Sequence, residues 1–176
     1  MSDIPKSKRS GSKLEAVHKA YMIRSRITQE LLLSFAYSQK KLEDHVKKIT
    51  AYIPDPQERE ARAKVILEAE ENFDLWIIQK EREDVLKYAK GIVQHLIAAN
   101  TVYPQYPSEF EERRVEMDRA MECCNQLQQE LQYIAEVLPA DKNKYMSIAL
   151  EVKGEFEMIK KLRQSDNRFL KHLKKL

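Results

Sequence analysis

The chain contains few residues that interrupt helices or support cofactor chemistry: its 176 residues include three glycines, six prolines and two cysteines. Three isolated glycines cannot form a glycine-rich phosphate loop. The two cysteines are neighbours, Cys123 and Cys124, so an unstrained disulfide between them is not expected. Two ligands without a second pair also make a poor zinc site. We predict that Cys124 is a small core residue and that Cys123 flanks it.

Long apolar runs are missing as well. No segment approaches the roughly 18 apolar residues that a membrane-spanning helix requires. The polar residues 1–12 lack the apolar stretch of a signal peptide. The sequence therefore predicts a cytoplasmic protein that makes no contact with a membrane.

Sets of residues that could carry catalysis are also scarce. Glu15 and His18 form one Glu-x-x-His pair, whereas a di-iron site in a helical bundle needs two such pairs and two further glutamates. His45, His95 and His172 stand apart from any cysteine or serine partner that would suggest a nucleophile with its base. We predict a non-enzymatic protein that holds no metal and no cofactor.

What the chain does contain is helix-forming sequence, rich in Glu, Lys, Leu, Ala, Gln and Arg. We predict an all-α fold: an up-and-down four-helix bundle with long helices, because short connections make neighbouring helices antiparallel. The first helical segment should be kinked near residues 34–38, where the apolar pattern shifts. The expected organisation is a disordered basic arm at residues 1–12, a helical bundle at 13–162 and a basic amphipathic C-terminal extension at 163–176.

Prolines and capping residues mark the predicted helix boundaries. Asp55 and Pro56 should start a helix as its N-cap and first-turn proline. The apolar pattern continues this helix for about forty residues, with a bend near Lys80 as the alternative. Ser108 and Glu111 predict a capping box for the next helix.

Apolar residues three or four apart predict the core face of each helix. The expected face of the first helix is Leu14, Val17, Tyr21, Thr28, Leu31, Leu32 and Phe35. The face expected after residue 108 is Met117, Ala120, Cys124, Leu127, Leu131, Ile134 and Leu138. Residues with this spacing form the seam of a bundle or coiled coil.

The seam of the last helix fails near the C-terminus. It runs through Tyr145, Ala149, Val152, Phe156 and Ile159, and the same register then reaches Arg163 and Asp166. Either the helix leaves the bundle after about residue 162, or it breaks at residues 165–167 and a short basic amphipathic helix begins. Both alternatives predict a basic end that projects from the body.

Positive charge is concentrated at the two ends of the chain. Residues 1–13 carry a net charge of +3, residues 160–176 carry +6, and residues 14–159 carry −6. Lysine-rich ends can simply aid solubility, and cations at a helix C-terminus meet the helix dipole favourably. Seven cations in the last seventeen residues, interleaved with Phe169 and leucines, exceed that explanation. The pattern indicates contact with a polyanion, and an acidic lipid or an acidic protein groove is the alternative.

The segment Tyr103-Pro-Gln-Tyr106-Pro should form the main loop. Its two aromatic rings could stack on unpaired bases or hold a protein partner. Closing one end of a bundle is the commoner role of such a loop.

A short basic arm that leads into a helical bundle without catalytic residues resembles the accessory proteins of diversity-generating retroelements and the four-helix proteins encoded by intervening sequences of ribosomal RNA. The stretches that carry the resemblance are Ser12-Lys-Leu-Glu-Ala-Val-His18, Glu130-Leu-Gln-Tyr-Ile134, Pro139-Ala-Asp-Lys-Asn-Lys-Tyr145 and Ser165-Asp-Asn-Arg-Phe169. The resemblance implies a helical protein that works with a reverse transcriptase and its template RNA. It differs in charge, because those bundles are basic over the body.

We therefore predict a non-enzymatic accessory or scaffold protein that binds nucleic acid, with RNA favoured, through its basic termini. A reverse transcriptase and further copies of the chain are additional candidate partners. The alternative is a helical protein–protein interaction module or obligate oligomer that binds no nucleic acid. The predicted nucleic-acid-binding residues are Lys6, Lys8, Arg9, Lys13, Arg163, Arg168, Lys171, Lys174 and Lys175.

Overall fold

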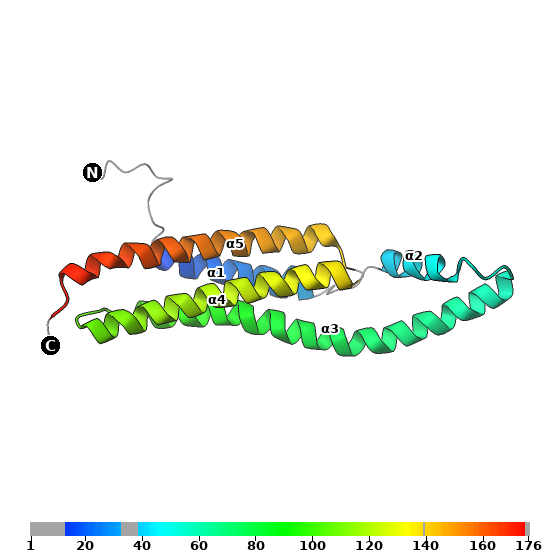
Figure 1. The fold of residues 1–176 in the computed structure, drawn as a ribbon, viewed down its shortest axis with the longest axis horizontal. Helices are drawn as coiled ribbons and strands as arrows, with labels where there is room; N and C mark the ends of the chain where they lie inside the picture. Colours follow the sequence, from blue (N-terminus) through cyan, green and yellow to red (C-terminus); the bar gives the residue numbers. More distant parts are fainter. Residues whose placement is uncertain (1–12, 33–38, 139, 175–176) are drawn as a thin grey trace.

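A computed structural model describes residues 13–32, 39–138 and 140–174, and every regular element among them is helical (Figure 1). The elements in chain order are α1 (Lys13–Arg26), the π-helical turn η2 (Ile27–Leu31), α2 (Gln39–Thr50), α3 (Pro56–Thr101), α4 (Pro107–Val137), α5 (Lys142–Ser165) and the 3-10 helix η4 (Asp166–Lys171). The predicted all-α class is confirmed. The expected kink near residues 34–38 and the basic arm at 1–12 lie outside the described residues.

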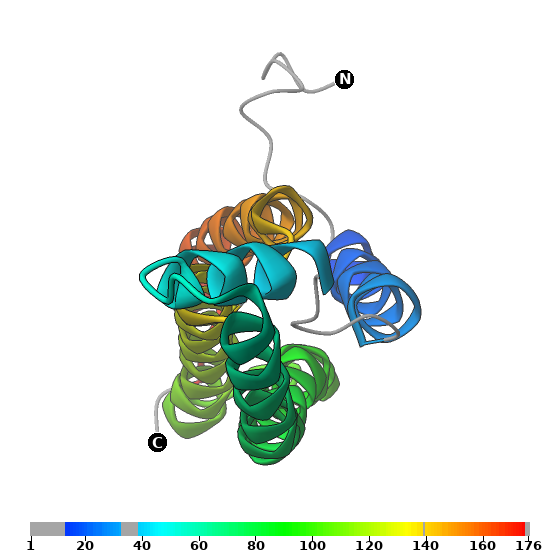
Figure 2. The same cartoon turned by 90° about the vertical axis from the view of Figure 1, so that its right-hand side faces the viewer.

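Helices α1, α3, α4 and α5 lie alongside one another and enclose the core (Figures 1 and 2). Helix α1 packs against α3 and α5, and α4 packs against the same two helices. The predicted seam of α4 is confirmed, because all seven of its residues from Met117 to Leu138 are buried. Cys124 is buried and Cys123 is half-buried, as expected.

The predicted core face of the first helix is partly wrong. Leu31 and Leu32 are buried as expected, but Tyr21 is 49% exposed and Thr28 is exposed. The buried positions that the prediction missed are Ala16, Ala20, Ile23 and Ile27. The prediction favoured large apolar side chains over alanine. Small residues at the contact allow two helices to approach closely, so they can be buried as completely as larger ones.

Helix α3 is continuous over 46 residues, as the apolar pattern indicated. Asp55 is its N-cap and accepts hydrogen bonds from the backbone amides of Gln57 and Glu58 at 3.2 and 3.4 Å, which confirms the predicted start at Pro56. Gly91 lies where this helix approaches α4: a Cβ atom there would lie 2.7 Å from the Sγ atom of Cys123. A glycine normally destabilises the interior of a helix, and this close approach between α3 and α4 explains why one is found here.

Helix α2 and the first part of α3 extend beyond the other helices at one end of the molecule (Figure 1). Helix α2 packs against α3, and the two enclose Val46, Thr50 and Ile53. We refer to residues 39–73 as the helical arm. The apolar residues of this segment had been expected to contribute to the bundle.

The predicted capping box of Ser108 and Glu111 is wrong. Helix α4 begins earlier, at Pro107, with Tyr106 as its N-cap. The carboxylate of Glu109 accepts hydrogen bonds from the amides of Gln105 and Tyr106 at 2.7 and 3.1 Å. Pro107 needs no hydrogen-bond partner for its nitrogen in the first turn, so it can start the helix.

Of the two predicted alternatives for the last helix, the break at residues 165–167 is confirmed, because α5 ends at Ser165 and the short helix η4 follows. The expected projection of the C-terminal end is wrong. Helix α5 passes into η4 at Asp166, and both Asp166 and Phe169 are buried. The backbone amide of Lys174 donates a hydrogen bond of 2.8 Å to the carbonyl oxygen of Gln105, in the loop between α3 and α4. The basic segment therefore folds onto the end of the bundle.

Candidate nucleic-acid interface

The C-terminal segment and the α3–α4 loop together enclose a cavity of about 540 Å³. Its lining combines two aromatic rings with three basic side chains: Tyr103, Pro104, Gln105, Arg168, Phe169, His172 and Lys174. We refer to this site as the C-terminal groove. It unites two features that are 65 residues apart in the sequence, the Tyr-Pro loop and the basic end.

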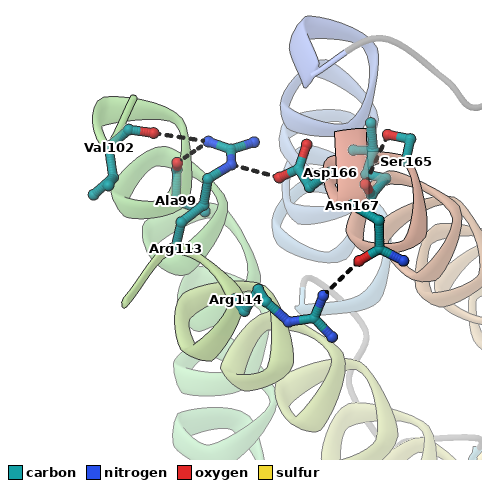
Figure 3. A network of polar contacts seen from close by, with 8 residues as sticks. Ala99, Val102, Arg113, Arg114, Ser165, Asp166 and Asn167 are labelled. Atoms are coloured by element: carbon teal, nitrogen blue, oxygen red, sulfur yellow. Dashed lines mark hydrogen bonds and ion pairs between the residues drawn. The ribbon is translucent and has the colours of Figure 1, made fainter. Parts of the chain in front are cut away.

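A buried ion pair positions this segment. Arg113, on α4, and Asp166, at the start of η4, are 0% and 1% exposed, and Nε of Arg113 lies 2.5 Å from Oδ2 of Asp166 (Figure 3). Nη1 of Arg113 donates to the carbonyl oxygens of Ala99 and, at 3.2 Å, of Val102. Those carbonyls lie at the C-terminal end of α3, where the last turn has no helical donors of its own. One guanidinium therefore joins the end of α3, the start of α4 and the end of α5.

A second contact lies beside the buried pair. Nη1 of Arg114 donates to Oδ1 of Asn167 at 2.9 Å on the exposed side of the same junction (Figure 3). Within the described residues, Nη2 of Arg113 and Oδ1 of Asp166 have no hydrogen-bond partner. Because both side chains are buried, the loss of either partner would leave the other as an uncompensated buried charge.

Aromatic rings and cations alternate across the groove. The rings of Tyr103 and Phe169 meet edge to face, with centroids 5.6 Å apart and planes at 80°. Arg168 lies 5.2 Å above the ring of Phe169. Lys174 lies 5.6 Å above the ring of Tyr106, and its Nζ donates to Oε1 of Gln105 at 3.3 Å. Tyr103 is 70% exposed, so much of its ring is open to solvent.

The structure places the predicted nucleic-acid-binding residues in different environments. Arg168, Lys171 and Lys174 are exposed on the C-terminal segment, and two of them line the groove. Arg163 instead forms an ion pair with Asp118 on α4, with Nε and Oδ1 2.5 Å apart, which reduces its availability to a ligand. Lys13 is the first residue of α1. Lys6, Lys8, Arg9 and Lys175 lie outside the described residues.

Arg113 is the residue that sequence reasoning missed. The seam of α4, read backwards from Met117 by four residues, reaches Arg113, just as the seam of α5 reaches Asp166. A cation in one seam and an anion in the neighbouring seam, both near the same end of the bundle, are the signal of a buried pair. Only the interruption at Arg163 and Asp166 had been noted, so the pairing with Arg113 was not predicted.

Neither a metal site nor a membrane helix is found in the described part of the chain. Across residues 13–32, 39–138 and 140–174, no three His, Cys, Asp or Glu side chains gather in a way that could hold a metal ion. In the same ranges, no helix has both the length and the apolar character to cross a membrane.

No protein-family model, curated protein or solved structure matches this chain. The geometry and charge of the C-terminal groove are therefore the basis for a functional assignment.

Glu155, on α5, is a second unusual buried group. Its side chain is 0% exposed, and neither carboxylate oxygen has a hydrogen-bond partner among the described residues. Burial raises the pKa of Glu155 to about 7, against the opposing effect of the Lys19 ammonium 4.0 Å away. A carboxyl group whose pKa rises on folding binds more protons in the folded state between its two pKa values.

The pH dependence of stability should report on Glu155. Because its pKa rises from 4.5 to about 7 on folding, the free energy of unfolding should fall as pH rises through this window. Glu155→Gln should reduce this dependence, of which Glu81 contributes a further part because burial raises its pKa to about 7 as well. The substitution should stabilise the protein at about pH 8 by roughly 2 kcal/mol. Urea denaturation at about pH 5 and pH 8 measures both effects. Glu157→Gln, at an exposed position of α5, is the matched control, and an equal effect of the two substitutions would contradict the assignment.

Proposed function

We propose that this protein is a non-enzymatic accessory or scaffold protein that binds single-stranded RNA in its C-terminal groove. The observation that carries the proposal is the joining of exposed Arg168 and Lys174 with the 70% exposed ring of Tyr103 in one cavity, where the buried ring of Phe169 supports Tyr103 edge to face. Cations bind the phosphate backbone and release its counterions, whereas aromatic rings stack on unpaired bases. A surface that offers both favours a single strand, because bases in a duplex are already stacked and paired.

The distribution of net charge along the chain also favours the C-terminal groove as the binding site. Residues 14–159 carry a net charge of −6, which repels a polyanion from the body of the molecule. The +6 of residues 160–176 offsets this repulsion locally at one end. A nucleic acid is therefore attracted to the end that carries the groove.

The proposal also includes an architecture and a partner. Helices α1, α3, α4 and α5 form one up-and-down four-helix bundle, which holds the α3–α4 loop and the C-terminal segment in fixed register. By its resemblance to retroelement accessory proteins, the chain works in the cytoplasm with a reverse transcriptase and presents RNA to it. The groove itself carries out no chemical step.

Fluorescence anisotropy with a labelled single-stranded RNA of about 12 nucleotides tests the proposal. We expect binding at about 50 mM salt that weakens steadily towards 300 mM, with little binding of duplex RNA or duplex DNA. Tyr103→Ala should weaken binding about 10-fold, because it removes one stacking surface. Tyr133→Ala, at a 44% exposed tyrosine of α4, is the control and should leave binding unchanged. Absence of RNA binding at low salt would refute the proposal.

A further inference from the structure

The helical arm lies at the end of the molecule opposite the C-terminal segment (Figure 1). It exposes large apolar side chains. Tyr52 is 78% exposed and Val65 is 54% exposed, and the two line a groove of about 460 Å³. The other lining residues are Ile53, Glu58, Ala61 and Arg62. The proposed binding of RNA uses none of these residues.

The exposed face has the spacing of a helix-packing surface. Glu58, Ala61, Arg62 and Val65 follow one another at intervals of three, one and three residues, so they lie on one face of α3. Faces with this spacing normally pack against another helix, and a small residue such as Ala61 allows close approach. Since these side chains line an open groove, this face of α3 has room for a further helix.

The charges on this face are self-complementary. Glu58 and Arg62 flank Ala61, and neither forms an ion pair with a residue that the structure describes. If the same face of a second molecule lies antiparallel on it, Glu58 of each copy meets Arg62 of the other. A two-fold contact of this kind brings residue i against j and j against i. The apolar side chains of Tyr52 and Val65 then pack beside two ion pairs.

The size of the arm sets the strength of such a contact. Glu81 faces Glu130, and α4 ends seven residues later at Val137, so the antiparallel α3 extends beyond α4 before about residue 74. The projecting part of α3 is then about 27 Å long, and two helices side by side are about 20 Å wide. With Glu58 opposite Arg62, however, the contact is centred on residue 60, and since α3 begins at Pro56 the two copies of α3 overlap over residues 56–64, about 12 Å. A contact of this length is smaller than a stable protein–protein interface, so a dimer formed through it is weak.

We propose that the helical arm is a homodimerisation surface, in which α3 of one copy packs antiparallel on α3 of a second copy with Glu58 opposite Arg62. The dimer is weak and reversible. It places the two C-terminal grooves at opposite ends of an elongated particle, because each groove lies far from its own arm.

A charge-exchange experiment tests the contact. In a dimer of Glu58→Arg, two arginines would face each other at each former ion pair, and in a dimer of Arg62→Glu, two glutamates would do so. Each variant alone should therefore remain a monomer. When the two variants are mixed, every arginine again faces a glutamate across a heterodimer, and so the mixture should dimerise as the wild type does. Sedimentation velocity from about 5 to 300 µM measures the dimer fraction in each sample.

The controls separate this contact from a general effect of charge or of misfolding. Lys153→Glu, at an exposed position of α5, should leave the dimer unchanged. Circular dichroism should give all variants the helix content of the wild type. A wild type that stays monomeric at about 300 µM, or single variants that dimerise as strongly as the wild type, would overturn the proposal. A mixture that remains monomeric would overturn the pairing of Glu58 with Arg62.

Discussion

Arg113→Ala should lower the free energy of unfolding by about 3–5 kcal/mol. The substitution leaves the carboxylate of Asp166 buried without its cation, and it removes the donor to the carbonyl oxygens of Ala99 and Val102. A buried charge that has lost its partner costs more than the pair contributed when intact. Urea denaturation followed by circular dichroism measures the loss.

Two further variants test whether the ion pair is the cause. Arg114→Ala, which removes the exposed contact with Asn167, should cost less than about 1 kcal/mol. The double substitution of Arg113→Met and Asp166→Leu removes both charges and should recover most of the stability lost in Arg113→Ala. An Arg113→Ala variant as stable as Arg114→Ala would show that the buried pair does not hold the C-terminal segment.

Reversal of the two groove cations has the largest expected effect on binding. Arg168→Glu combined with Lys174→Glu should weaken binding of single-stranded RNA by about 100-fold at low salt, and it should flatten the dependence on salt. Each cation that no longer meets a phosphate lowers the slope of affinity against salt by about 0.7. Anisotropy titrations across a salt series measure both quantities.

The control for this reversal has the same change in net charge. Lys90→Glu combined with Lys153→Glu alters two exposed positions on α3 and α5, away from the groove. Because distant surface charges are largely screened beyond about 10 Å, we expect a change of less than about 3-fold. Equal losses for the two pairs would contradict a localised site.

Local sequence made the start of α3 predictable, but not the start of α4. Pro56 after Asp55 supplies both a fixed backbone angle and a side-chain cap, so the start of α3 follows from a few neighbouring residues. The predicted start of α4 was wrong because two capping arrangements are possible within a few residues. Glu109, and not Glu111, caps the helix, because its carboxylate accepts hydrogen bonds from the preceding loop. The seam of α4 was predictable because its apolar residues repeat at alternating intervals of three and four without a gap.

The core positions of α1 and the burial of Asp166 could not be predicted, because they depend on contacts between residues far apart in the sequence. The choice between Ala16 and Val17 as the core position of α1 depends on how closely α3 and α5 approach, which no local pattern contains. The same limit applies to Asp166, whose burial depends on Arg113, 53 residues away. The cations of the C-terminal groove were predicted from charge, but their union with Tyr103 required the fold of the segment onto the α3–α4 loop.

Photo-crosslinking of a uridine-rich single-stranded RNA, followed by mass spectrometry of the crosslinked peptides, tests the proposed site most directly. Binding in the C-terminal groove predicts crosslinks in the peptides that contain Tyr103 and Phe169, which are lost at high salt and reduced by Arg168→Glu with Lys174→Glu. Crosslinks confined to the helical arm or to the outer faces of α4 and α5, with none near Tyr103 or Phe169, would contradict it.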